Sequence, residues 1–152
     1  MAIEWTNDLN TGIDVIDAQH KSIVNYINQL EDAIKQGNRQ SVGHVLSELV
    51  NYTLSHFAFE ESLQEEAGYA NCGTHKAVHN LFAKRVAKYQ EAHKNGEDVA
   101  QTTHDMLKSW LVNHIKRDDM GYVNEVRARI DSIVDDKKEG GWLNRSLGKM
   151  FK

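Results

Sequence analysis

The sequence predicts an all-helical protein, and three observations support this prediction. The chain of 152 residues contains no proline, and 26% of its residues are charged. Apolar residues recur every three or four positions over most of its length, which is the pattern of an amphipathic helix with one buried face. Glycines and short polar runs separate these stretches. Because helices joined by short loops normally pack as antiparallel neighbours, we expect a helical bundle.

Composition excludes several classes of protein. A chain of this length is most simply one domain with a substantial core. The formal net charge of -4 provides no basic field and argues against a nucleic-acid partner. No apolar run approaches the roughly 18 residues of a membrane span, and the N-terminus lacks a secretory signal pattern. Because the single cysteine, Cys72, cannot form an internal disulfide, we expect a reducing, cytoplasmic location.

Residues 1–16 are predicted to form an N-terminal arm that packs on the bundle. Gly12 breaks any early helix in this segment. The apolar anchors of the arm are Trp5, Ile13 and Ile16.

A first helix is predicted from Asp17, a good N-cap, to Gly37. His20 shares the inward face of this helix with a stripe of apolar residues, Ile23, Val24, Ile27, Leu30 and Ile34. A lone histidine on an apolar face is more often a hydrogen-bonded core residue than a metal ligand. His20 alone therefore leaves both interpretations open.

Two further helices are predicted over residues 39–66 and 74–94, with Thr74 as the N-cap of the later one. Gly68 and residues 70–73 mark the chain reversal between them. The apolar stripe of the earlier helix consists of Val42, Val45, Leu46, Leu49, Thr53, Phe57 and Leu63, and that of the later helix of Val78, Phe82, Val86 and Tyr89.

Polar side chains occupy positions on these stripes where a helix would otherwise carry leucine. His56 and Glu60 stand four residues apart, and so do His75 and His79. Each pair therefore lies on one helix face, with its members about 40° apart around the axis. A buried glutamate without a partner costs several kcal/mol. Because a metal ion between the two helices would satisfy it, the pattern predicts a metal site inside the bundle.

A fourth helix is predicted to start near Glu97 or Asp98 and to direct His114 inward. Its stripe also contains Thr103, Met106, Leu107, Trp110, Leu111 and Ile115. A further helical segment is indicated by Tyr122, Val123, Val126, Ile130 and Ile133. Residues 135–141 are predicted to be a linker into a short tail.

The two aspartates after His114 leave an ambiguity. Asp118 follows His114 by four residues and Asp119 by five. Five residues turn an α-helix through about 500°, so Asp119 would point some 140° away from His114 unless the helix loosens there. Gly121 favours such a local break.

These residues together resemble the hemerythrin family, particularly bacterial hemerythrins. The resemblance extends from Trp5 through the start of the first helix and the segments HFAFEE, HKAVH and HIKRDDMGY, and leaves only the C-terminal tail outside it. It implies an antiparallel up-down four-helix bundle that holds two non-haem irons. The family spacing also selects Asp119 rather than Asp118 as a ligand.

The resemblance implies that three imidazoles hold one iron, two imidazoles hold the other, and two carboxylates bridge both. The three imidazoles are those of His75, His79 and His114, and the two are those of His20 and His56. The bridging carboxylates are those of Glu60 and Asp119. These groups and one bridging oxo or hydroxo ligand leave a single position open on two six-coordinate irons. That position lies on the iron with two histidines, where we expect a small molecule to bind.

An apolar pocket is expected beside the open position. The family places pocket residues at Ile23, Phe57, Phe82, Trp110, Leu111 and Ile115. All six are also ordinary core residues, so packing alone is an equal explanation for each. Apolar walls of this kind exclude water while they admit a diatomic molecule.

The function implied by the resemblance is reversible binding of dioxygen by Fe²⁺/Fe³⁺, for transport, storage or delivery, without enzymatic turnover. Di-iron enzymes of the ferritin-like type use four glutamates and two histidines, whereas this set has fewer anionic ligands and disfavours oxidative chemistry. Two alternatives remain open. One is a di-iron oxidase or a protein that removes peroxide or nitric oxide, and the other is an oxygen or iron sensor.

Several residues have competing interpretations. His44, His93 and His104 do not fit the ligand pattern and are expected to be surface or structural residues. Cys72 is expected to be a simple loop residue rather than a redox sensor. Tyr122 either forms a hydrogen bond near the site or merely packs.

The C-terminal segment is expected to lie outside the di-iron domain of residues 1–134. Within residues 135–152, the tail has an apolar half formed by Trp142, Leu143, Leu147, Met150 and Phe151, and a basic half formed by Arg145, Lys149 and Lys152. This short amphipathic helix either covers the bundle of the same chain or docks on a membrane surface or on an oxygen-consuming partner protein. We expect the protein to be a monomer.

Overall fold

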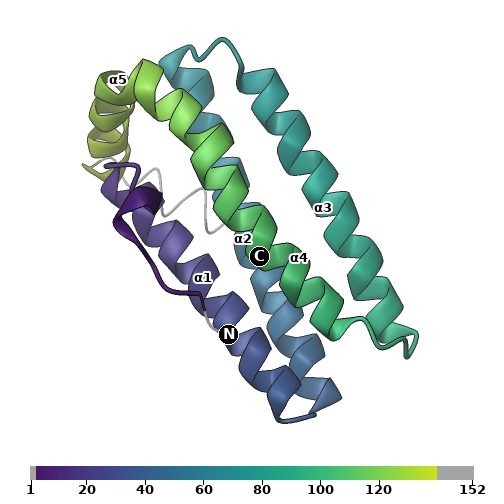
Figure 1. The fold of residues 1–152 in the computed structure, drawn as a ribbon. Helices are drawn as coiled ribbons and strands as arrows, with labels where there is room; N and C mark the ends of the chain where they lie inside the picture. The colour runs from purple at the N-terminus through teal and green to yellow at the C-terminus, as the bar shows by residue number, and fades with distance from the viewer. Residues whose placement is uncertain (1–2, 140–152) are drawn as a thin grey trace.

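The computed structural model describes residues 3–139, and all the regular structure in that range is helical. The elements are η1 (Asn7–Leu9), α1 (Asp14–Lys35), α2 (Arg39–Ala67), α3 (Cys72–Lys94), α4 (Ala100–His114), the π-helical turn η2 (Ile115–Asp119) and α5 (Met120–Glu139). Helix α1 packs against α2 and α4, and α3 packs against the same two helices, so α1 to α4 form a four-helix bundle (Figure 1). The predicted fold class is confirmed.

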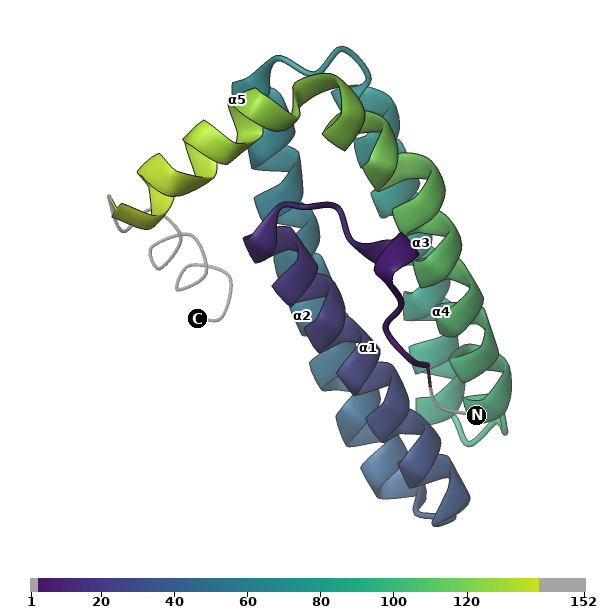
Figure 2. The same cartoon turned by 60° about the vertical axis from the view of Figure 1, so that its left-hand side comes forward.

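Helix α5 leaves the axis of the bundle. Figure 2 shows it turning away from α4 at one end of the bundle, where it lies across the end of α2. It continues to Glu139, so residues 135–139 are helical where the sequence predicted a linker. The predicted tail lies outside the described residues. Within residues 3–139, no helix combines the length and the apolarity that a membrane span requires.

Two separate apolar clusters stabilise the fold. The larger occupies the bundle and includes Ile23 and Leu111, whereas the smaller joins the start of α1 and the end of α2 to α5 and includes Ile16 and Leu63. Along α1, the change from one cluster to the other occurs across His20. The same change occurs across the polar positions of α2 and of the α4–α5 segment. A polar layer therefore lies between two apolar ones.

The N-terminal arm meets the bundle differently from the prediction. Helix α1 begins at Asp14, and Asp17 is not its N-cap. Instead, the Asp17 carboxylate accepts hydrogen bonds from the backbone N–H of Thr11 at 2.8 Å, from the Thr11 hydroxyl at 2.8 Å and from the N–H of Gly12 at 3.2 Å. The predicted break is present, because Gly12 has a φ of 85°. Asp17 therefore fastens the arm to the first turn of α1.

Two other helix starts also differ from the prediction. Helix α3 begins at Cys72 with Asn71 as N-cap, rather than at Thr74. The preceding helix ends with Gly68 in the left-handed region, so only a short connection separates α2 from α3. Helix α4 begins at Ala100, because the N–H of Glu97 still bonds to the carbonyl of Ala92 and completes the end of α3.

Gly37 and Gly73 allow the effect of a left-handed backbone on stability to be tested. Gly37 has a φ of 67° with no atom within 4 Å of the position that a Cβ would take, whereas Gly73 lies inside α3 with equally open surroundings. Because only the first position has a left-handed backbone, Gly37→Ala should lower the free energy of unfolding by about 1 kcal/mol. Gly73→Ala should raise it by about 0.5 kcal/mol. Urea unfolding of the metal-loaded variants measures both, and equal effects of the two substitutions would contradict the backbone argument.

Candidate metal centre

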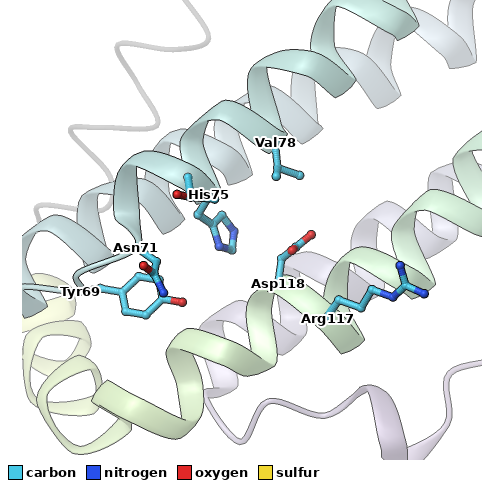
Figure 3. A pocket seen from close by; sticks show the side chains of 7 residues that line it. Tyr69, Asn71, His75, Val78, Arg117 and Asp118 are labelled. Carbon is cyan, nitrogen blue, oxygen red and sulfur yellow. The ribbon is translucent and has the colours of Figure 1, made fainter.

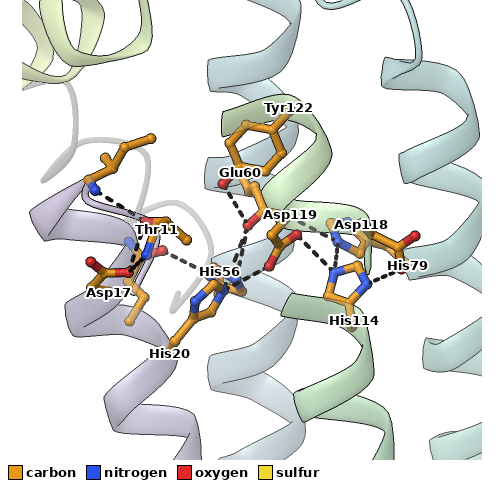
Figure 4. Close-up of polar contacts among 12 residues, drawn as sticks. Thr11, Asp17, His20, His56, Glu60, His79, His114, Asp118, Asp119 and Tyr122 are labelled. Atoms are coloured by element: carbon orange, nitrogen blue, oxygen red, sulfur yellow. Dashed lines mark hydrogen bonds and ion pairs between the residues drawn. The ribbon is translucent and has the colours of Figure 1, made fainter. Parts of the chain in front are cut away.

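Seven polar side chains meet in the layer between the two apolar clusters. They come from all four bundle helices and from η2, and each has at most 4% of its surface exposed. They are His20 of α1, His56 and Glu60 of α2, His75 and His79 of α3, His114 of α4 and Asp119 of η2. Figure 4 shows several of them pointing toward one another from separate helices. The sequence predicted each of these residues to be a ligand, and the structure brings all of them together.

The ligand atoms fall into two groups that share both carboxylates. One group contains three histidines, His75, His79 and His114, and the other contains two, His20 and His56. Glu60 and Asp119 belong to both groups, and within each group the ligand atoms lie within 4.8 Å of one another. The arrangement can hold two metal ions side by side.

Each carboxylate directs one oxygen to each group. Oε1 of Glu60 lies 2.7 Å from Nε2 of His75 and 3.2 Å from Nε2 of His79, whereas Oε2 lies 3.4 Å from Nε2 of His56. Two oxygens that face different histidine groups are suited to bridge two cations.

Asp119 repeats this division of its oxygens. Oδ1 lies 3.0 Å from Nε2 of His75 and 3.2 Å from Nε2 of His114, and Oδ2 lies 3.1 Å from Nε2 of His20. Both carboxylates therefore span the two groups in the same way.

The polar atoms of this layer fit a bound metal better than a hydrogen-bonded network. Nε2 of His79 and Nε2 of His114 lie 3.0 Å apart and face each other, an arrangement in which one must donate to the other. Both ring nitrogens of His20, Nε2 of His56 and both oxygens of Asp119 are buried without a hydrogen-bond partner in the described structure. Because buried polar atoms are rarely left unpaired, these residues fit a cation that takes their lone pairs.

The π-helical turn accounts for the position of Asp119. Its N–H···O=C bond runs from Met120 to Ile115, five residues apart, instead of the α-helical four. Because a π-helical turn rotates the chain less per residue than an α-helix does, the residue five places after His114 returns close to the same helix face. The helix thus loosens where the spacing of His114 and Asp119 requires it to, although the turn ends before Gly121, which lies inside α5.

Asp118, the alternative candidate, has a different position. Its carboxylate accepts a hydrogen bond from Nδ1 of His114 at 2.8 Å, on the side of the ring away from the centre. Asp118 therefore supports a histidine and is absent from both groups of ligand atoms.

Neighbouring groups of opposite charge together outweigh burial in setting the pKa values of several ligand residues. Burial lowers the pKa of His75, but its close contacts with the carboxylates of Asp119 and Glu60 outweigh burial and raise that pKa to about 9. Burial also opposes the charged form of His114, whereas the charge of Asp119 and the hydrogen bond to Asp118 raise its pKa to about 10. For Glu60, burial raises the pKa, but His56, His75 and His79 together hold it well below its usual value. Burial and the charge of Glu60 raise the pKa of Asp119, but His114 and His20 outweigh them and lower it, so both carboxylates are anionic and attract a cation.

Two contacts at the centre link residues far apart in sequence. The Tyr122 hydroxyl donates a hydrogen bond to Oε2 of Glu60 at 3.2 Å, which decides between the two interpretations of this tyrosine. Nδ1 of His56 lies 2.6 Å from Oε1 of Gln19. Gln19 was not predicted to have a role, because it lies one position before His20 and gives no helical-face signal toward His56.

The aromatic residues of the predicted pocket lie mainly against the three-histidine group. Phe57 stacks on His79 with ring centroids 3.8 Å apart, and Trp110 stacks on His114 at 4.4 Å. Phe82 stacks on Trp110 in turn, at 3.7 Å. The three aliphatic members of the predicted pocket, Ile23, Leu111 and Ile115, are buried in the larger cluster. Their role as an oxygen pocket stays a prediction.

The two-histidine group is covered by the N-terminal arm. The Trp5 ring lies 6.5 Å from the His20 ring between centroids, and its indole N–H donates to the Asn10 side chain at 2.7 Å. Lys21 lies over the same indole at 5.4 Å. The arm thus contributes a wall to this side of the centre.

A surface hollow approaches the opposite side. It has a volume of about 280 Å³ and lies between the start of α3 and η2 (Figure 3). Its lining consists of Tyr69, Asn71, Thr74, His75, Val78, Arg117 and Asp118. The hollow therefore reaches His75, a member of the three-histidine group.

The remaining histidines and the cysteine lie away from the centre. His44 is exposed and pairs with Glu48, whereas His93 and His104 are buried elsewhere in the bundle. Cys72 is half-buried at the start of α3, and burial raises the pKa of its thiol, which opposes a reactive thiolate.

Comparison with known proteins assigns the family. Residues 11–126 match the family described as "Hemerythrin HHE cation binding domain". The chain belongs to the hemerythrin family. Bacteriohemerythrin of Pseudomonas aeruginosa strain LESB58 is 51% identical over 147 residues, covering 97% of this chain and 96% of that protein, and bacteriohemerythrin of Stenotrophomonas maltophilia is 48% identical with the same coverage. A crystal structure of wild-type hemerythrin superposes with a TM-score of 0.77 at 35% identity, covering 82% of this chain and 97% of that one. The family and its cation-binding domain agree with the buried cluster.

Removing one shared carboxylate should remove the metal. Glu60→Ala takes a ligand from both groups at once, so we expect the purified variant to contain less than one tenth of the metal of the parent protein, while far-UV circular dichroism shows most of the helix retained. His104→Ala is the control, because His104 is equally buried but belongs to neither group. Elemental analysis measures the metal, and unchanged content in Glu60→Ala would remove this residue from the ligand set.

Proposed function

We propose that the chain binds dioxygen reversibly at a non-haem di-iron centre, as a protein of oxygen transport, storage or delivery. The observation that carries the proposal is the shared use of Glu60 and Asp119 by two histidine groups. Five imidazoles and two bridging carboxylates match the set that the hemerythrin family pattern assigns to two irons. Imidazole nitrogen also suits zinc and copper, so iron is inferred from the family and not from the donor atoms alone.

The chemistry supplied by two irons, when bound with a bridging oxo or hydroxo group, is the transfer of two electrons to dioxygen on binding and their return on release. The protein's part is to hold the irons at a fixed separation and to limit what reaches them. Glu60 and Asp119 set the separation, because each has one oxygen toward each histidine group. Neutral imidazoles supply little negative charge, which disfavours strongly oxidising states of iron.

The unequal number of histidines in the two groups supports a single position for dioxygen. Three imidazoles and two carboxylates would leave less room on one iron than two imidazoles and two carboxylates would leave on the other. We infer that dioxygen binds on the side of His20 and His56. The partner of the protein is then a diatomic molecule, and neither an organic substrate nor a nucleic acid is required.

Apolar walls and a hydrogen-bonded tyrosine support reversibility. Ile23, Phe57, Leu111 and Ile115 belong to the larger apolar cluster on one side of the polar layer, and the fully buried Tyr122 belongs to the smaller cluster on the other side. Burial first, and then the charges of Glu60 and Asp119, raise the pKa of Tyr122 well above its usual value. Its hydroxyl therefore keeps its proton and remains a donor to Glu60. Exclusion of water slows the protonation and loss of bound ligand.

The proposal includes three expectations about the protein in the cell. We expect it to act as a monomer in the cytoplasm and to have no enzymatic turnover of its own. An oxidase, a protein that removes peroxide or nitric oxide, and an oxygen or iron sensor are the alternatives. A docking role of residues 142–152 concerns a segment outside the described structure.

Reversibility is the decisive test. The fully ferrous protein should develop a visible absorption band within seconds of contact with air, lose it when oxygen is removed, and regain it over several cycles. Stopped-flow and steady-state absorption measure these changes. If no band forms, or if the irons become irreversibly ferric within one cycle while hydrogen peroxide appears in solution, the carrier proposal is wrong and an oxidase takes its place.

A polar residue in the wall should shorten the life of the oxygenated form. Leu111 is 2% exposed and lies one turn before His114, so Leu111→Asn should admit water and raise the rate of irreversible oxidation roughly tenfold. Leu107→Asn is the matched control, since Leu107 is 1% exposed but lies a further turn away from the centre. Repeated absorption spectra in air give both rates. Equal acceleration in the two variants would indicate general destabilisation and no wall function.

A further inference from the structure

Two imidazoles of the three-histidine group have a carboxylate behind them. The one behind His114 is hydrogen-bonded to it, whereas the one behind His79 lies beyond hydrogen-bond distance of Nδ1, which has no hydrogen-bond partner in the described structure. Asp118 accepts the hydrogen bond from Nδ1 of His114 at 2.8 Å, and the Glu61 carboxylate lies 3.8 Å from Nδ1 of His79 (Figure 4 shows the former pair). Because a carboxylate only accepts, Nδ1 of His114 carries a proton, and a cation at the centre displaces any proton from Nε2. The lone pair of Nε2 then faces the centre, which is the tautomer that a metal ligand needs.

The two-histidine group has only a neutral support. Oε1 of Gln19 accepts a hydrogen bond from Nδ1 of His56 at 2.6 Å, and both side chains are buried. Nδ1 of His20 has no hydrogen-bond partner in the described structure. Gln19 therefore sets the tautomer and the orientation of His56 in the same way that Asp118 does for His114, but it adds no charge.

The carboxylates behind the imidazoles and the extra imidazole both favour metal binding at the three-histidine position. A carboxylate behind an imidazole increases the electron density that the ring offers to a cation, whereas an amide orients the ring alone. Asp118 has 35% of its side chain exposed and Glu61 has 15%, so solvent weakens this effect without removing it. The three-histidine group thus has both the extra imidazole and the anionic supports.

We propose that the two metal positions fill in a fixed order, the three-histidine position first and the two-histidine position second, with Asp118 and Gln19 as their respective positioning residues. The proposal rests on the two-metal centre of the proposed function and extends it to the way the centre is assembled. It follows that the position inferred to receive dioxygen is also the one that loses its metal first. A chain with one ion is then a defined state.

The order of filling can be measured with Co²⁺ as the probe. Metal-free, full-length protein is titrated without oxygen, and calorimetry and visible absorption follow the binding. We expect two resolved steps for the parent protein. Asp118→Asn should weaken the first step about 10- to 100-fold and leave the second within about threefold. Gln19→Leu should do the reverse.

Two further variants separate positioning from packing. Gln19→Glu keeps an oxygen acceptor for Nδ1 of His56 and adds the negative charge, so it should tighten the second step relative to the parent protein. Gln64→Leu is the matched control, because Gln64 is a fully buried glutamine whose amide has no hydrogen-bond partner in the described structure. It should leave both steps unchanged.

The possible outcomes distinguish this proposal from the proposed function. Two equal steps in the parent protein, or an equal effect of Asp118→Asn and Gln19→Leu on both steps, overturn the order of filling. Two resolved steps with the expected effects support it even if the iron-loaded protein fails the oxygen cycle, in which case only the oxygen proposal is wrong. Uptake of a single ion by the parent protein contradicts both proposals.

Discussion

The constraint on which the rest of the structure depends is the burial of two anionic carboxylates. Glu60 and Asp119 have no exposed surface, and they lie among five imidazoles instead of beside lysine or arginine. Such burial is tolerated only where positive charge compensates it. Because the histidines come from α1, α2, α3 and α4, a cation bound there joins all four helices at one level. The two apolar clusters on either side keep that level free of competing solvent.

Helix α5 is tied to the same constraint. It begins directly after Asp119, and three residues later Tyr122 donates a hydrogen bond to Glu60 while its ring belongs to the smaller apolar cluster. The short segment from Asp119 to Tyr122 thus contains one shared carboxylate and donates a hydrogen bond to the other, Glu60. The position of α5 at the end of the bundle and the geometry of the centre therefore depend on each other, and the π-helical turn is the local adjustment that makes both possible.

The two sides of the centre differ in what surrounds them. Stacked rings of Phe57 and Trp110 cover the three-histidine group, whereas the arm covers the two-histidine group through Trp5. Stacking restricts the rotation of His79 and His114, and Asp118 restricts it further through a hydrogen bond. The more tightly held side is suited to retain its metal, and the other side is suited to exchange a small ligand. This division is consistent with the proposed position of dioxygen.

The sequence by itself determined the helical class, the inward faces of the helices and the presence of His and Glu on them. These follow from spacings of three and four residues, which are local properties of an α-helix. Only the tertiary structure decided between Asp118 and Asp119 by geometry, because a π-helical turn breaks the local rule, and only it joined Gln19 to His56 and Tyr122 to Glu60. Those pairs are 37 and 62 residues apart, and contacts over such separations depend on how helices pack rather than on any periodicity. The sequence also did not predict the starts of α1 and α3. Asp17 accepts hydrogen bonds from the arm instead of capping α1, and α3 begins at Cys72, two residues before the expected cap Thr74.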